Sequence, residues 1–160
     1  MGIPAHLWIK GDGGSAINGS STVSGREGSI EVMGFSHGLN LPIDAQTGAI
    51  TGTRTHSPMT IEKEIDAASV YLYKAVAKGE TLQSAELRWY RIDDSGNEAV
   101  YFTMLLAGVK VTGVYSGMAN TKLTGASQLN HMETVSLMYE RIKWHYADGN
   151  LEFSDAWNDR

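Results

Sequence analysis

Alternating apolar and polar positions dominate this chain and predict long β-strands. From residue 82 to residue 92, one face carries Ala85, Leu87 and Trp89, and the other carries Glu86, Arg88 and Tyr90. Residues 93–97 (DDSGN) supply turn chemistry. A second strand is expected from Glu98 to about Tyr115, with Tyr101, Leu105, Val109 and Val111 on one face. The two strands together predict a long antiparallel hairpin.

Residues 131–146 (HMETVSLMYERIKWHY) show a change of apolar face within one strand-like run. Val135, Leu137 and Tyr139 occupy odd positions, whereas Ile142, Trp144 and Tyr146 occupy even ones. The switch near Glu140 and Arg141 indicates a bulge, or a strand that leaves one sheet to join another. Asp148-Gly149 then favours a tight turn into LEFSDAW. Long bent strands of this kind are typical of small barrels and orthogonal sandwiches.

One segment, residues 69–78 (SVYLYKAVAK), predicts a helix. Its expected apolar face holds Val70, Tyr73 and Ala77, with Leu72 and Val76 beside them. Ser69 is expected to cap the helix and Gly79 to end it. One helix among so many strands predicts a mainly β fold, a small bent β-barrel or two-sheet sandwich with one flanking helix. Residues 1–160 are expected to form a single domain.

Composition narrows the functional classes. The chain of 160 residues has a formal net charge of −5 and no cysteine. No basic stripe is available for a nucleic-acid backbone, and no apolar run is long enough to enter a membrane as a spanning helix. The first residues lack the pattern of a cleavable signal peptide. Without cysteine, disulfides, thiolate zinc sites and cysteine nucleophiles are excluded.

Short catalytic motifs are present but lack their structural context. GFSHG, residues 34–38, fits the nucleophile elbow around Ser36, yet Pro42 follows where that motif needs a helix. GDGGSA, residues 11–16, fits a loose dinucleotide motif but precedes a polar, turn-rich segment. The five histidines form no recognised metal pair. We therefore expect no catalytic, cofactor-binding or metal residues, and no enzymatic activity.

Residues 47–91 (TGAITGTRTHSPMTIEKEIDAASVYLYKAVAKGETLQSAELRWYR) carry a more specific pattern. Its key positions are Gly52-Thr53-Arg54, His56, Pro58, Lys63-Glu64-Ile65-Asp66 and Leu72-Tyr73-Lys74-Ala75. Flanking matches are GSIEV at 28–32, Tyr101-Phe102, Val109-Lys110-Val111, METVSLMYERIKWHY and the C-terminal DAW. In order and spacing, nearly the whole chain resembles the haemolysin-coregulated protein (Hcp) family, the tube protein of bacterial type VI secretion.

The resemblance implies a bent β-barrel with a flanking helix, assembled as a homohexameric ring. Rings would stack into a hollow tube inside a contractile sheath and beneath a spike protein, and small effector proteins would travel in the lumen. Assembly would take place in the bacterial cytoplasm, with export through the type VI apparatus and no cleaved signal peptide. A mechanical and chaperoning role of this kind needs no cofactor.

The long loop at residues 44–58 (DAQTGAITGTRTHSP) is rich in Gly and Thr and has no core pattern. Loops of this length are uncommon unless they are functional. Given the resemblance, we expect the loop to reach a neighbouring subunit or ring, with Arg54 and His56 as polar contacts. The contact set expected there is Thr47, Gly48, Thr51, Gly52, Thr53, Arg54 and His56.

Ser36 is a candidate lumen-facing residue under this resemblance. Strand parity groups Ser36 with Ile30 and Val32, which look buried, whereas a bulge at Gly34 would turn it outward. Both orientations are open from the sequence. The main rival to a tube protein is a monomeric β-barrel module that binds a small molecule or carbohydrate. That rival predicts a monomer with an interior pocket.

Overall fold

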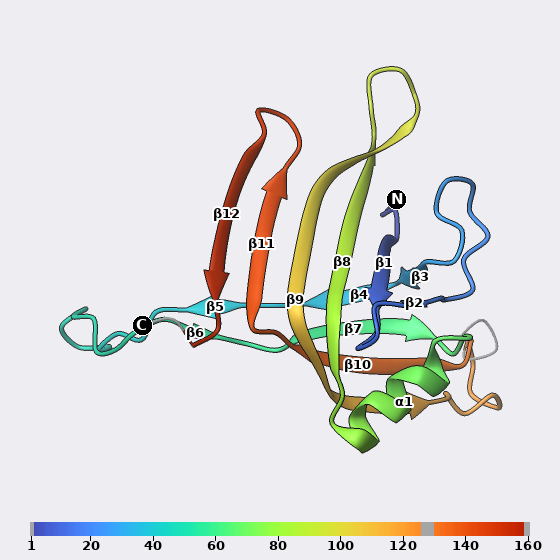
Figure 1. Cartoon of the computed structure of the whole chain (residues 1–160), viewed down its shortest axis with the longest axis horizontal. Helices are drawn as coiled ribbons and strands as arrows, with labels where there is room; N and C mark the ends of the chain where they lie inside the picture. The colour runs from blue at the N-terminus through green and yellow to red at the C-terminus, as the bar shows by residue number, and fades with distance from the viewer. Residues whose placement is uncertain (1, 126–129, 159–160) are drawn as a thin grey trace.

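The computed structural model describes residues 2–125 and 130–158, and within them the chain forms twelve strands and one helix (Figure 1). In chain order these are β1 (Ala5–Lys10), β2 (Ala16–Ile17), β3 (Ile30–Val32), β4 (Gly34–Ser36), β5 (Leu39–Asn40), β6 (Thr55–His56), β7 (Met59–Glu64), α1 (Ser69–Lys78), β8 (Thr81–Ile92), β9 (Glu98–Gly117), β10 (Met132–Met138), β11 (Arg141–Tyr146) and β12 (Leu151–Ala156). The predicted mainly β fold with one helix is confirmed.

One strongly curved antiparallel sheet holds most of the strands, in the order β2-β1-β8-β9-β10-β7-β4. β11 pairs with β9, β12 pairs with β11, and β3 pairs with β1. Across the part of the chain that the structure describes, the sheet does not close on itself. β3 pairs with β1 near one end of the strand order, and β4 pairs with β7 at the other end. The short segment 30–36 therefore bridges the two ends of the sheet, and among the described residues no continuous ladder closes it into a barrel.

The long hairpin is confirmed as β8 and β9, but the predicted face of β9 is partly wrong. Leu106, Val109 and Val111 are buried, whereas Leu105 is only partly buried. The spacing of three between Leu106 and Val109 means that the strand changes face at Gly108. Gly108 has a φ of 63°, which a residue with a side chain rarely adopts. A strict alternation read from the sequence cannot detect this bend.

Gly108 also contacts the break between β10 and β11, at residues 139–140. Its carbonyl oxygen accepts a hydrogen bond from the Glu140 amide at 3.1 Å, and a Cβ at position 108 would lie 2.7 Å from the Glu140 side chain. We expect Gly108→Ala to lower the free energy of unfolding by about 1–3 kcal/mol, because of the positive φ and this close approach. Gly117→Ala is the matched control on β9, where a Cβ meets nothing within 4 Å. Urea denaturation compares them, and equal stability of the two variants would contradict the assignment.

The change of face predicted near Glu140 and Arg141 is confirmed. Leu137, Tyr139 and Ile142 are all buried, so the buried parity moves from odd to even positions. β10 ends at Met138 and β11 begins at Arg141. Both strands pair with β9, but β10 has β7 on its other side and β11 has β12. At the break, the strand-like run therefore exchanges β7 for β12 on one side and keeps β9 on the other.

The helix has the predicted bounds, and Gly79 ends it in a left-handed conformation with φ 63°. The predicted buried face is wrong: the buried residues are Ser69, Leu72 and Ala75, while Val70 is 74% exposed. Apolar residues occur all around this helix, so periodicity alone did not identify the face that packs on β9. No helix among the described residues is long and apolar enough to cross a bilayer.

Ser69 is the first residue of α1 and not its cap. The N-cap is Ala68, which makes no side-chain cap. The Ser69 hydroxyl instead accepts a hydrogen bond from the Asp66 amide at 3.0 Å and donates to Glu133 at 2.7 Å. The sequence signal for a cap therefore marked a residue that anchors the helix to β10.

His6 on β1 is a buried histidine that makes stability depend on pH. Its Nδ1 lies 2.8 Å from the Ser29 hydroxyl, and burial, followed by the nearby Arg26 charge, lowers its pKa. The unfolded chain takes up a proton near pH 6.5 that the folded chain resists, so stability is complete above that value and falls as pH drops below it. We expect stability to fall between about pH 7.5 and pH 5, and His6→Gln to make this fall smaller, as measured by urea denaturation. An unchanged loss in the variant would contradict this.

Candidate functional site

A hydrogen-bonded arm projects from the sheet at the position of the predicted Gly/Thr-rich loop. We define the arm as residues 39–56: β5 and β6 pair at its root, and the loop between them extends to the far left of Figure 1. Near the tip, Ile43 and Ile50 form an antiparallel bridge, and the Asp44 amide donates to the Ala49 carbonyl at 2.7 Å. The Thr51 amide donates to the Pro42 carbonyl at 3.0 Å. These bonds make the arm an irregular hairpin with a defined direction.

The arm is anchored at its root to the C-terminal strand β12. Arg54 donates two hydrogen bonds to the Asp155 carboxylate, each 2.6 Å long. His56 Nε2 lies 2.8 Å from the same carboxylate. The Arg54 Nη2 also reaches the Ala156 carbonyl at 3.3 Å. Bidentate pairing of arginine with a carboxylate fixes geometry as well as supplying energy.

A buried tyrosine completes the root. The Tyr139 hydroxyl lies 2.7 Å from His56 Nδ1 and 2.8 Å from His37 Nε2. The His56 ring stacks on Trp157 with ring centres 5.6 Å apart, and Trp157 also meets the Tyr139 ring edge to face. Tyr139 follows β10 directly and is buried on the same odd parity as Val135 and Leu137. We call His37, Arg54, His56, Tyr139 and Asp155 the root network.

Electrostatics in the root network favour a charged carboxylate and a neutral His37. The hydrogen bonds from Arg54 hold the pKa of Asp155 well below its ordinary range, and the bond from His56 acts in the same direction. Burial lowers the pKa of His37, and the neighbouring His56 lowers it further. Burial also raises the pKa of Tyr139, so its hydroxyl keeps its proton.

The residues expected to contact neighbours divide into two groups in the structure. Thr47, Gly48, Thr51, Gly52 and Thr53 are exposed on the arm, whereas Arg54 is half-buried and His56 is buried in the root network. The structure therefore gives Arg54 and His56 partners within the chain, and contact with a second subunit stays a prediction for the whole set.

Ser36 is exposed at the end of β4, which corresponds to the outward orientation. The Met33 amide donates to the Glu62 carbonyl at 2.8 Å between β3 and β4. The segment changes face there, so Phe35 packs against the core and Ser36 does not. Its position relative to a lumen stays a prediction.

A second buried charge cluster lies beneath the N-terminus of α1. Lys63 on β7 is fully buried and pairs with Glu133 on β10, which is 1% exposed. Its Nζ also lies 2.9 Å from Asp66 Oδ1 and 3.3 Å from the Ser69 hydroxyl. The cluster joins β7, β10 and the helix.

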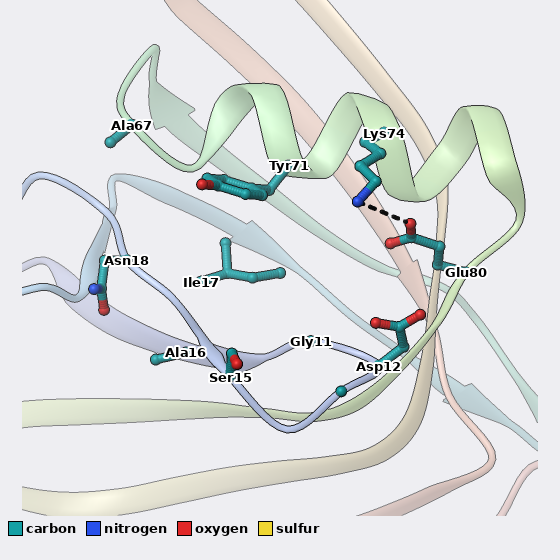
Figure 2. Close-up of a pocket in the computed structure, with 11 residues that line it drawn as sticks. Gly11, Asp12, Ser15, Ala16, Ile17, Asn18, Ala67, Tyr71, Lys74 and Glu80 are labelled. Atoms are coloured by element: carbon teal, nitrogen blue, oxygen red, sulfur yellow. Dashed lines mark ion pairs between the residues drawn. The ribbon is translucent and has the colours of Figure 1, made fainter.

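A hollow of about 470 Å³ lies between α1 and the turn that joins β1 to β2 (Figure 2). Ile17 and Tyr71 line its apolar side, and Lys74 and Glu80 form an ion pair at 3.6 Å on its rim. This is the place where the rival small-molecule module would bind its ligand. Across residues 2–125 and 130–158, no cluster of three or more metal-binding side chains occurs.

The sequence reasoning missed His37, Tyr139 and Asp155 as members of the root network. Asp155 and Tyr139 lie about a hundred residues from the arm, and no local spacing joins them to it. Tyr139 keeps the buried odd parity of Val135 and Leu137, so the local pattern did not set it apart from a core residue. Lys63 and Glu133 were also missed, because charged residues in an alternating strand pattern are normally expected to face solvent.

Comparisons with known proteins agree on one family. The family described as "Type VI secretion system effector, Hcp" matches residues 6–146. The "Major exported protein" of Pseudomonas aeruginosa is 31% identical, over 98% of this chain and 96% of its own length. The solved structure of a mutant Hcp1 protein from the E. coli EAEC 042 pathovar is 51% identical, with a TM-score of 0.87 over 97% of this chain and 99% of that one. The secreted protein Hcp3 from Pseudomonas aeruginosa is 26% identical, with a TM-score of 0.80 over 98% of this chain and 99% of that one.

Proposed function

The chain belongs to the Hcp family of type VI secretion tube proteins, and from this membership we propose that its copies assemble as hexameric rings stacked into a hollow tube. The family is structural and not enzymatic, which agrees with the sequence, where the short catalytic motifs lack their structural context. In this proposal residues 1–160 act as one tube domain. The tube is assembled in the cytoplasm and exported by the type VI route without a cleaved signal peptide.

The arm is the observation that carries the proposal. It holds aliphatic side chains away from the sheet, with Ile43 59% exposed and Ile50 65% exposed. Exposed apolar groups on a rigid projection favour burial against another molecule. A ring needs a heterologous contact, in which one surface of a subunit meets a different surface of the next. A projecting arm supplies one half of such a contact.

Further exposed apolar side chains supply candidate surfaces for the other half. Val70, Tyr71 and Tyr73 lie on the solvent side of α1, and Leu151 and Phe153 lie on β12, which pairs on one side with β11. Burial of these groups between copies would explain why a short helix is apolar all around. In the same proposal Ser36 faces the lumen, the contractile sheath surrounds the tube, the spike protein lies at its tip, and small effector proteins pass through the lumen.

Light scattering on a size-exclusion column, with negative-stain images of the same peak, tests the assembly. We expect a species of roughly six times the 17.4 kDa chain mass, seen as rings with an open centre. A monomer at every concentration would overturn the tube proposal. The small-molecule module would then take its place, with the hollow beside α1 as its site.

The arm has its own test. We expect Ile50→Asp to abolish rings, because a carboxylate at a buried contact costs several kcal/mol. The protomer should keep its stability within about 0.5 kcal/mol, because the side chain is exposed within one chain. Val23→Asp is the matched control, an exposed aliphatic residue outside the arm. Rings that persist in Ile50→Asp would show that the tip of the arm makes no essential contact.

A further inference from the structure

Both strands at the root of the arm are tied to a single hydroxyl group. His37 lies just before β5 and His56 lies in β6, and each places one ring nitrogen against the Tyr139 hydroxyl. Tyr139 is 1% exposed, so water does not compete readily for this group. The other nitrogen of His56 faces Asp155. The orientation of the arm therefore depends on the protons shared among these groups.

The number of protons that the root network can share limits the charge states of His37 and His56. The Tyr139 hydroxyl has one proton to donate, and its oxygen accepts from the second neighbour. With Asp155 ionised, His56 carries a proton on Nε2. If Tyr139 donates to His56 Nδ1, then His37 donates to Tyr139, and this arrangement holds whether His37 is neutral or charged. If Tyr139 donates to His37, then His56 carries both protons and is charged.

Each arrangement thus accommodates one charged histidine but not two. When His37 and His56 are both protonated, each points an N–H at the Tyr139 oxygen, and the hydroxyl proton loses its acceptor. A buried donor without a partner is costly. Two imidazolium ions would also join the Arg54 guanidinium beside one carboxylate, Asp155.

Among the described residues, the remaining surroundings of the two rings are aromatic: Phe35 and Trp144 beside His37, and Trp157 beside His56. They come from β4, β11 and the segment after β12. The charged groups of the root network beside the two histidines are Arg54 and Asp155.

We propose that the root network is an acid-sensitive latch, which holds the arm while at most one of His37 and His56 is charged and releases it when both are. The consequence for assembly rests on the proposed function, in which the arm joins one subunit to another. Acid then loosens rings by freeing the arm before the sheet unfolds. Histidine is suited to this task because its ordinary pKa lies within the physiological range.

The absence of cysteine makes a direct test of the latch possible. Ala45→Cys places one reactive thiol on an exposed residue of the arm, where a nitroxide spin label reports its mobility. The label is followed from about pH 7.5 to about pH 4.5 while circular dichroism monitors the fold. We expect label mobility to rise while the circular dichroism is unchanged. The steepness should correspond to about one proton per arm, because the held arm already accommodates the first.

His37→Gln in the labelled protein removes one titrating group and keeps an amide that can bond to Tyr139. We expect release by acid to be lost over this range, because the one remaining histidine can be charged while the arm is still held. His145→Gln is the matched control, because His145 is half-buried and bonds to Asn150 outside the root network. A label that responds only when the fold is lost, or a His37→Gln titration identical to its parent, would overturn the latch.

Light scattering of the unlabelled protein over the same range separates the two proposals. Rings that dissociate at the pH where the label is released, and persist to lower pH in His37→Gln, support both. Rings at neutral pH together with a label that does not respond to acid would overturn the latch proposal and would leave the tube proposal standing. A monomer at every pH overturns the tube, while the label titration still decides the latch.

Discussion

Replacing Lys63 with methionine should lower the free energy of unfolding by about 3–5 kcal/mol, one of the two largest effects that we expect from a single substitution. Lys63 is fully buried and compensates the carboxylate of Glu133, whose second oxygen has no hydrogen-bond partner among the described residues. Without the ammonium group, Glu133 keeps only the Ser69 hydroxyl as a donor to its first oxygen. An uncompensated carboxylate would then remain in the interior.

Urea denaturation at one fixed protomer concentration measures this loss, because assembly also contributes to apparent stability. The double variant Lys63→Met with Glu133→Leu should regain most of it, since it removes both charges together. Lys74→Met is the matched control: Lys74 is exposed and pairs with Glu80 at 3.6 Å, so its loss should stay below about 1 kcal/mol. Equal losses for Lys63→Met and Lys74→Met would contradict the conclusion that Lys63 compensates a buried carboxylate.

Asp155→Asn should destabilise the folded chain by about 2–4 kcal/mol and free the arm at neutral pH. The carboxylate accepts from Arg54 twice and from His56 once, and an amide can satisfy only part of this set. Because the pKa of Asp155 is lowered, the stabilisation is present above the ordinary carboxyl pKa. It is lost only as pH falls through the lower folded value. A loss of stability between about pH 7.5 and pH 5 is therefore not caused by Asp155.

Denaturation and limited proteolysis of the arm measure the Asp155 effect together. Glu152→Gln is the control on the same strand, because Glu152 is exposed and lies 3.8 Å from Lys143. We expect the control to retain its stability within about 0.5 kcal/mol and to resist proteolysis as the parent does. If Asp155→Asn behaves like the control, the arm is held by other contacts.

Local patterns predicted the features that depend on neighbouring residues. The β8–β9 hairpin, the change of face at residues 139–140 and both ends of α1 follow from alternation, turn residues and Gly79. The buried face of α1 did not follow, because Val70, Leu72 and Tyr73 are all apolar and only the packing against β9 selects among them. The bend at Gly108 was missed because one glycine in a strand does not reveal its φ.

The root network and the Lys63 cluster show what a local pattern cannot supply. Arg54 and Asp155 are 101 residues apart, and Lys63 and Glu133 are 70 residues apart. Each pair is brought together by strand order, not by spacing. Resemblance to the family did mark Arg54, His56 and the DAW segment as characteristic positions. It did not reveal that Asp155 of that segment is the partner of the other two.

The anchoring of the arm to Asp155 on β12 also has a consequence for synthesis on the ribosome. Residues 39–56 are made first, and their anchor at Asp155 follows about a hundred residues later. At the usual rate of translation this interval lasts several seconds. During it the arm lacks its carboxylate partner and has no fixed direction. The order of synthesis therefore delays a fully anchored arm until β12 has emerged.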